Sequence, residues 1–158
     1  AGGAGAGGWG EGRGAARARR DGKGDGSGTP NWLDRPATDQ AAAKQFYGEL
    51  FGWTYNDQPI DEGNKVFYSI GTLGGLDVAA IAPLGDQGAA GVPPHWNSYV
   101  TVANVDESAK KAEALGGKLL MPPFDVMDAG RMAVVQDPTG AAFEIWQANR
   151  SIVAEILN

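Results

Sequence analysis

The stretch NWLDRPATDQAAAKQFYGELFGW, residues 31–53, reads as a short strand, a polar cap and a helix that ends at glycine. Residues 97–118, NSYVTVANVDESAKKAEALGGK, repeat this form about 65 residues later, with Ala43-Lys44 opposite Ala109-Lys110. Similarity at a fixed offset is typical of a repeated structural unit. The sequence therefore predicts two copies of a strand–helix unit.

Three further strand-like runs follow each predicted helix, and turn-forming residues separate them. The runs are WTYNDQPI, KVFYSIG and LDVAAIAPL in the first half, and KLLMPPFDV, RMAVVQ and AAFEIWQ in the second. The separator DPTG, residues 137–140, suits a type I turn with Pro at the second position and Gly at the fourth. Each half thus predicts a β-α-β-β-β module. From two such modules we predict an α+β domain of two sheets, in which each helix covers one face of its sheet.

The predicted helices have candidate caps and apolar stripes. In the first helix, Thr38 or Asp39 can cap the start, Phe46 and Leu50 form the expected i, i+4 stripe, and Gly52 ends it. In the second helix the candidate caps are Asn104 or Asp106, the expected stripe is Ala109, Ala112 and Leu115, and Gly116-Gly117 ends it. We expect each stripe to face its sheet.

Alternation along the strands sorts the remaining side chains by face, because successive residues of a strand point to opposite sides. Phe143 and Ile145 share one face, which we expect to pack under a helix. The other face collects aromatic and polar side chains from three strands: Trp32, Asp34, His95, Asn97, Tyr99, Glu144 and Trp146. Such a mixture is typical of a small-molecule pocket. The residues alone fit a dimer interface or a filled core equally well.

Composition limits the possible functions. The chain has no cysteine and a single histidine, His95, so a metal site would need mostly oxygen ligands. Residues 29–158 carry eight basic and sixteen acidic side chains, a net charge of −8, which opposes nucleic-acid binding. No apolar run is long enough to span a bilayer. We therefore expect a soluble, cytoplasmic protein that binds neither nucleic acid nor membrane.

The N-terminal segment, residues 1–28, differs from the rest of the chain. It holds 12 of the 25 glycines and one large apolar side chain, Trp9. A segment of this composition cannot bury enough apolar surface to offset the entropy lost on ordering. We interpret it as a disordered Gly/Arg-rich tail or linker, followed by a domain at residues 29–149 and a C-terminal extension at residues 150–158.

Three phrases, DQAAAKQFYGELFGW, VANVDESAKKAEALGGKL and GRMAVVQDPTGAAFEIWQ, resemble the vicinal-oxygen-chelate superfamily of glyoxalases, bleomycin-resistance proteins and extradiol dioxygenases. Their order and spacing are most similar to its actinobacterial glyoxalase-like branch, in which two such domains often occur in tandem. The resemblance covers residues 29–149. It implies two β-α-β-β-β modules that form a concave mixed sheet, and a homodimer or tandem-domain pseudo-dimer. It also implies that the tail is a linker after a first domain.

In metalloenzymes of this superfamily, the first and last strands of each module supply one ligand each to a divalent ion. The matching positions here are Trp32, Ala79 or Ala80, Asn97 and Glu144, of which only Glu144 is retained as a strong ligand. A shifted site of Asp34, His95 and Glu144 is the alternative, since it would combine one histidine with two carboxylates. Each shift of two residues moves a ligand about 6–7 Å along its strand, so the site would have to be rebuilt.

Glu144 therefore has several candidate roles. Among aromatic side chains its pKa would rise, and it could act as a catalytic general base. It could equally bind a cationic or hydroxyl-bearing ligand, with Trp32, Asp34, Asn97, Tyr99 and Trp146 as the other ligand contacts, or face water. We expect a domain that binds a small organic molecule in the concave cleft without a metal cofactor. The alternatives are a divalent-metal-dependent lyase, isomerase or dioxygenase, and a partner-binding domain whose cleft is closed by dimerisation.

Overall fold

The computed structural model describes residues 26–63, 65–85 and 91–149, which form two helices and eight strands in the predicted order. The first module contains β1 (Pro30–Ala37), α1 (Gln40–Phe51), β2 (Thr54–Pro59), β3 (Phe67–Leu73) and β4 (Leu76–Pro83). The second contains β5 (Asn97–Thr101), α3 (Val105–Ala114), β6 (Lys118–Val126), β7 (Gly130–Gln136) and β8 (Ala142–Ala148). The α+β class and the two β-α-β-β-β modules are confirmed.

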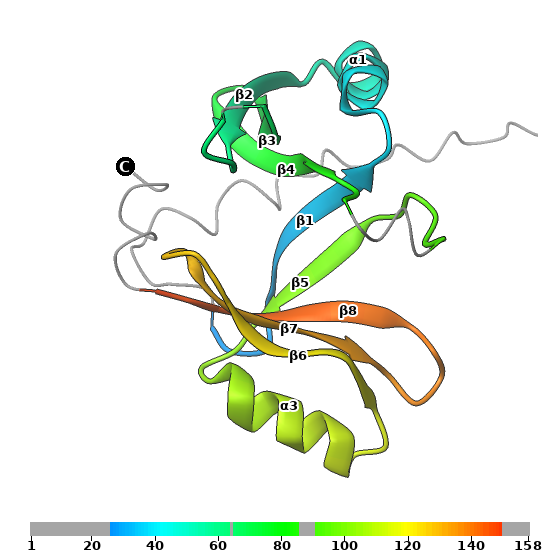
Figure 1. The fold of residues 1–158 in the computed structure, drawn as a ribbon, viewed down its shortest axis with the longest axis vertical. Helices are drawn as coiled ribbons and strands as arrows, with labels where there is room; N and C mark the ends of the chain where they lie inside the picture. The colour runs from blue at the N-terminus through cyan, green and yellow to red at the C-terminus, as the bar shows by residue number, and fades with distance from the viewer. Residues whose placement is uncertain (1–25, 64, 86–90, 150–158) are drawn as a thin grey trace, which may run out of the picture.

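The eight strands form one mixed sheet in the order β2-β3-β4-β1-β5-β8-β7-β6. Within each module the first and last strands pair in parallel, and β1 pairs with β5 in antiparallel orientation between the modules. The prediction of two separate sheets is therefore wrong. Each module leaves its first strand at an edge with unpaired backbone groups, and pairing the two edges satisfies both. In Figure 1, β1 and β5 cross the middle of the molecule and link the two halves.

Helix α1 begins and ends as the sequence predicts, but it presents a different face to the sheet. The Asp39 side chain caps its first turn by accepting from the Ala42 N–H at 2.9 Å, and Gly52 ends it in the left-handed conformation. The buried side of the helix is formed by Ala43 and Tyr47. Phe46 and Leu50 are each 57% exposed, so the predicted stripe is wrong. The small side chain of Ala43 lets the helix approach Ile81 of the sheet, which two large residues would prevent.

Helix α3 packs on the second module with the equivalent residue at its centre. Ala109, the repeat partner of Ala43, is buried with Val105 against Ala133, Val135 and Ile145. Asn104 caps the helix by accepting from the Glu107 N–H at 3.0 Å, and Ala112 packs at the edge of the core. The predicted third member of the stripe, Leu115, is 70% exposed. Its position explains the difference, because Leu115 follows the last helical residue, where the periodicity of the helix no longer places side chains.

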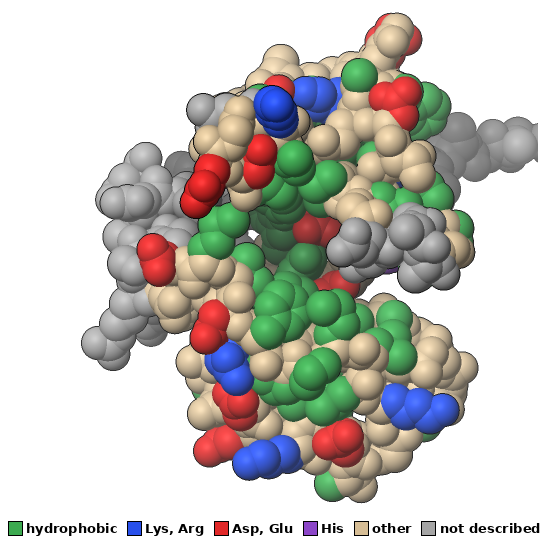
Figure 2. Space-filling view, in the orientation of Figure 1, with side chains coloured by type: hydrophobic (Ala, Val, Ile, Leu, Met, Phe, Trp, Pro, Cys, Tyr) green, Lys and Arg blue, Asp and Glu red, His purple; other side chains and the backbone are tan. Residues whose placement is uncertain are grey.

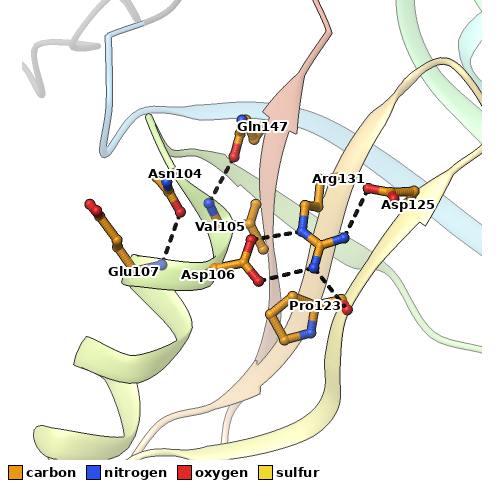
Figure 3. Close-up of polar contacts among 8 residues, drawn as sticks. All are labelled: Asn104, Val105, Asp106, Glu107, Pro123, Asp125, Arg131 and Gln147. Carbon is orange, nitrogen blue, oxygen red and sulfur yellow. Dashed lines mark hydrogen bonds and ion pairs between the residues drawn. The ribbon is translucent and has the colours of Figure 1, made fainter.

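Polar contacts attach the start of α3 to the strands beside it (Figure 3). Arg131 of β7 binds both carboxylate oxygens of Asp106, at 2.7 and 2.9 Å, and also donates to Asp125 of β6 at 2.9 Å. Gln147 of β8 accepts from the backbone N–H of Val105 at 2.9 Å. Three strands thus hold the first turn of α3 against one face of the sheet, which leaves the opposite face uncovered by this helix.

The predicted segment boundaries fall partly outside the described residues. Residues 1–25 and 150–158, which include most of the predicted tail and all of the predicted extension, are not described. Gly28 belongs to the described part, and its N–H donates to the carbonyl of Thr101 at 2.7 Å. Among the described residues, no helix has the length and apolar character needed to cross a membrane.

Candidate functional site

The uncovered face of the sheet carries the aromatic and polar side chains that alternation predicts. On β8, Ile145 packs in the core with α3, so Glu144 and Trp146 point to the opposite side. On β5, Tyr99 is the register partner of Glu144, and its ring meets that of Trp146 edge-on at 6.4 Å between centroids. Figure 2 shows the surface hollowed between the two halves of the molecule, with hydrophobic side chains around acidic ones. We call this hollow the cleft.

Asp34 of β1 is the centre of a hydrogen-bond network in the cleft. Its side chain is 4% exposed and accepts from the hydroxyls of Tyr99 at 2.9 Å and Tyr68 at 3.1 Å, and from the amide of Asn97 at 3.0 Å. Trp32 extends the network by donating its indole N–H to the Tyr68 hydroxyl at 2.7 Å. All three donors to Asp34 are neutral, so they stabilise its charge without cancelling it. The network joins β1, β3 and β5 across both modules.

Tyr68 is the member of this network that our sequence analysis missed. It lies on β3, and strand β4 separates β3 from β1, so its phenol ring must cross β4 to reach Asp34. The β4 residue in register with Asp34 is Ala80, which is 1% exposed and carries only a methyl group over which the ring can pass. Ser69 is buried and in register with Ile81 on the α1 side, so alternation places Tyr68 on the cleft face, although it does not reveal the reach of the side chain across β4.

Ala80→Leu tests this crossing. We expect the larger side chain to occupy the path of the Tyr68 ring, to break its bond to Asp34 and to lower the free energy of unfolding by about 1–3 kcal/mol. Urea unfolding monitored by circular dichroism measures the loss. Ala114→Leu, the same change at an exposed position at the end of α3, is the control and should change the stability little. Equal stability of the two variants would contradict the assigned path of the Tyr68 side chain.

Glu144 is a second buried carboxylate beside the network. It is 5% exposed, and its register partners are Tyr99 on one side and Val134 on the other. Its Oε2 atom is buried and has no hydrogen-bond partner among the described residues. Burial, and secondarily the charge of Asp34, raises the pKa of Glu144 to about 7. Burial also raises the pKa of Asp34, although hydrogen bonds from Tyr99, Asn97 and Tyr68 oppose this shift. The two carboxylates therefore compete for ionisation, and Glu144, without those donors, retains its proton more readily.

His95 lies just before β5 and does not complete a metal site. Its Nδ1 atom is 2.7 Å from the carbonyl oxygen of Pro93 in the loop before the strand. Across residues 26–63, 65–85 and 91–149, no three histidine, aspartate or glutamate side chains are grouped closely enough to hold one ion.

Most of the positions that match the superfamily's metal ligands hold residues that do not coordinate metal ions. The side chains of Trp32 and Asn97 are engaged in hydrogen bonds to Tyr68 and Asp34. The methyl side chain of Ala80 has no atom that can coordinate a metal ion. Glu144 alone offers an oxygen without a protein partner. A divalent ion in a protein generally takes three or more side-chain ligands, or carboxylates together with substrate oxygens. These residues do not fit such an ion.

A further aromatic group lies outside the cleft. The rings of Tyr47, Phe51, Trp53 and Trp96 pack together beside α1, with centroid separations of 5.3–6.4 Å. Trp96 lies just before β5, and its edge-on packing against Tyr47 of α1 places it on the α1 side of the sheet. Phe46, Leu50 and Phe51 leave apolar surface exposed on α1. The homodimer or tandem-domain pseudo-dimer stays a prediction.

The fold agrees with comparisons to known proteins. A family model described as Glyoxalase/Bleomycin resistance protein/Dioxygenase superfamily matches residues 29–145. The chain belongs to this superfamily. The resemblance predicted from the three sequence phrases is therefore confirmed.

Two curated relatives extend this glyoxalase-superfamily assignment. The chain is 53% identical over 131 residues to a Mycobacterium bovis protein named "Putative glyoxylase CFP32", covering 83% of the chain and 50% of the relative. It is 38% identical over 144 residues to "Anthracycline biosynthesis protein DnrV" of Streptomyces peucetius, covering 82% of the chain and 50% of that protein. The chain thus spans half the length of these relatives.

Solved structures of low sequence identity share the glyoxalase-superfamily fold. A methylmalonyl-CoA epimerase from Mycobacterium tuberculosis matches with a TM-score of 0.55 at 15% identity, over 79% of this chain and 91% of the epimerase. The protein BH1468 from Bacillus halodurans matches with a TM-score of 0.58 at 12% identity, over 79% of this chain and 97% of that one. At these identities the likeness shows the fold alone.

Proposed function

We propose that this glyoxalase-superfamily domain binds a small organic molecule in its cleft, without the divalent metal used by the superfamily's metalloenzymes. The observation that carries the proposal is the Oε2 atom of Glu144, which is buried and lacks a partner among the described residues. Buried polar atoms in native proteins are nearly always hydrogen-bonded to protein, water or ligand, so an atom that lacks a protein partner is open to water or to a ligand group. A ligand with a hydrogen-bond donor supplies that group.

The surroundings of Glu144 suit a ligand with a flat apolar body. Trp32, Tyr99 and Trp146 provide aromatic surface on the same side of the sheet, and Met132 and Val134 of β7 add aliphatic surface in register with Trp146 and Glu144. A small-molecule site typically combines such walls with a few fixed polar groups. Here Asp34 has the fixing role, because its hydrogen bonds to Tyr68, Tyr99 and Asn97 hold these side chains in place.

The residues at the metal-ligand positions favour ligand binding over metal-dependent catalysis. Three of the four positions that match metal ligands hold Trp32, Ala80 and Asn97, so a lyase, isomerase or dioxygenase reaction that needs a divalent ion has little support from these residues. The name of the Streptomyces peucetius relative, an anthracycline biosynthesis protein, is consistent with a small organic ligand.

Acid–base catalysis by Glu144 in the same cleft is a second candidate function. The pKa of Glu144, raised to about 7 by burial and by Asp34, favours it, because a general base works best when its pKa lies near the working pH. This role needs no metal. It would require a substrate whose acidic proton lies within hydrogen-bond reach of the Glu144 carboxylate.

Titration of the chelator-treated protein with a panel of aromatic compounds tests binding. The panel carries ammonium, hydroxyl or carboxylate groups, and tryptophan fluorescence is the readout. We expect saturable quenching by part of the panel, at least tenfold weaker binding by Glu144→Ala, and loss of most of the quenching in Trp146→Phe. Trp96→Phe, which changes a tryptophan outside the cleft, is the matched control and should keep the response. A flat response across the panel, or binding that requires an added divalent metal, would overturn the proposal.

A further inference from the structure

The cleft holds two buried carboxylates, and among the described residues no lysine or arginine pairs with either of them. His95, just before β5, lies near enough for its protonated form to attract Asp34, and no described basic side chain pairs with Glu144. The described ion pairs join Lys44 to Asp57, and Arg131 to Asp106 and Asp125, all away from the cleft. Asp34 and Glu144 are 4% and 5% exposed, so water screens their charges poorly. Buried charges in proteins are normally paired with an opposite charge. Among the described residues, Glu144 therefore lacks both a cationic partner and a hydrogen-bond donor to its Oε2 atom.

The two carboxylates differ in what they can still accept. Oxygen Oδ2 of Asp34 receives hydrogen bonds from both tyrosines and Oδ1 receives one from Asn97, so this side chain is well supplied with donors. Oxygen Oε2 of Glu144 receives none from the described residues. A cation that enters the cleft therefore finds its open acceptor at Glu144, with the charge of Asp34 nearby to attract it.

We propose that the ligand of this cleft is an organic cation, a protonated primary or secondary amine on a flat apolar body, whose ammonium group binds the Glu144 carboxylate. This inference rests on the proposed binding function and specifies its ligand class. It follows from the unpaired Oε2 atom, the second carboxylate and the adjoining aromatic rings. The ligand's N–H donates to Glu144, and its positive charge offsets the repulsion between the two acidic side chains.

The walls of the cleft favour the same ligand class. Trp146 lies two residues from Glu144 on the same face of β8, and its ring packs edge-on against Tyr99. Aromatic faces attract ammonium groups, most strongly when water is excluded. The net charge of −8 on residues 29–158 adds a long-range attraction for cations. Once Glu144 is ionised, a carboxylate ligand would meet two like charges, and a neutral alcohol would leave the repulsion between Asp34 and Glu144 in place.

A matched series of three compounds on one ring system tests the inference: naphthylmethylamine, naphthylmethanol and naphthoate. Affinities are measured by isothermal titration calorimetry at about pH 8, where the amine is protonated and Glu144 is ionised. We expect the amine to bind at least tenfold more tightly than the alcohol, and naphthoate to bind most weakly. The amine's advantage should shrink as salt is added, because salt screens an ion pair and affects an apolar contact little.

Two variants assign the preference to Glu144. In Glu144→Gln we expect the amine and the alcohol to bind with affinities within about threefold of each other, since the amide keeps the shape and loses the charge. Glu113→Gln removes the charge of an exposed glutamate on α3 and should keep the preference of the unmodified protein. Circular dichroism of both variants verifies that they fold. The salt dependence of amine binding by the unmodified protein tests for an ion pair without any variant.

The outcomes separate this inference from the proposed function. Equal or tighter binding of the alcohol or of naphthoate by the unmodified protein would overturn the cation assignment and leave small-molecule binding standing. An amine preference that persists unchanged in Glu144→Gln would also overturn it. Absence of binding by all three compounds, up to concentrations on the order of millimolar, would count against both.

Discussion

Glu144→Gln is expected to reduce the decline in stability that the folded protein shows as pH rises from about 5 to about 8, and Asp34, whose pKa burial also raises, contributes to the decline that remains. Burial and the charge of Asp34 raise the pKa of the folded-state carboxyl from 4.5 to about 7, whereas the unfolded chain keeps the ordinary value. Below 4.5 both states are protonated, and the stability associated with this group is fully present. As pH rises through 7 the folded state must ionise a buried group, so that stability is lost, up to a limit of about 3 kcal/mol.

Urea unfolding at several pH values measures this effect. The difference in the free energy of unfolding between the ends of the pH range should be smaller in Glu144→Gln than in the unmodified protein. Glu113→Gln, with the same chemical change at an exposed site, should follow the unmodified protein. A decline in Glu144→Gln as large as in the unmodified protein would mean that Glu144 does not titrate abnormally.

Asp34→Ala is expected to lower the free energy of unfolding on the order of 3 kcal/mol. The substitution removes the acceptor shared by Tyr68, Tyr99 and Asn97, and each buried donor left without a partner costs about 1–3 kcal/mol. Relief of the repulsion with Glu144 offsets part of this loss. Asp34→Asn should lose less, because its amide oxygen still accepts a hydrogen bond.

The Asp34 variants also change the titration of Glu144. Removal of the neighbouring charge should move the pKa of Glu144 down toward its ordinary value, which carbon NMR of the glutamate carboxyl groups can follow. Asp128→Ala, which removes an exposed aspartate side chain, is the control for both measurements and should change neither appreciably. An unchanged Glu144 titration in Asp34→Asn would contradict the electrostatic coupling of the two carboxylates.

The order of strands and helices could be predicted from the sequence because two signals repeat. Polar caps and terminal glycines mark both helices, and turn formers separate the strands. The central alanines of the two copies, Ala43 and Ala109, occupy equivalent buried positions on the sheet-facing sides of their helices. Pairing of β1 with β5 was missed, because a periodicity within one module does not reveal which edges meet between modules.

Helix faces were harder to predict than strand faces. Large apolar side chains suggested that Phe46 and Leu50 face the sheet, but the helix packs through Ala43 and Tyr47, where a small residue permits close approach. A helix places its residues about 100° apart, so a choice between neighbouring stripes depends on packing partners that the sequence does not identify. Strand alternation has only two outcomes, and it correctly placed Glu144 opposite Ile145.

The candidate site was predicted in part, because strand alternation assigns side chains to a face but does not identify their contacts across other strands. Alternation grouped the residues of β1, β5 and β8 on one face, and the structure joins Trp32, Asp34, Asn97 and Tyr99 in one network. The contribution of Tyr68 depends on a side chain that crosses a whole strand above Ala80, which a strand-by-strand analysis does not consider. The roles of these residues in ligand binding and of Glu144 in catalysis stay predictions.

Chemical-shift mapping of the tryptophan indole groups tests the cleft most directly as the binding site. In nitrogen-15-labelled protein titrated with naphthylmethylamine, each indole N–H gives its own signal, and single Trp→Phe variants assign them. We predict saturable shifts of the signals from Trp32 and Trp146, which lie on the cleft side of the sheet, with little change at Trp53 and Trp96 beside α1. Shifts confined to Trp53 and Trp96 would place binding on the opposite side and contradict the account.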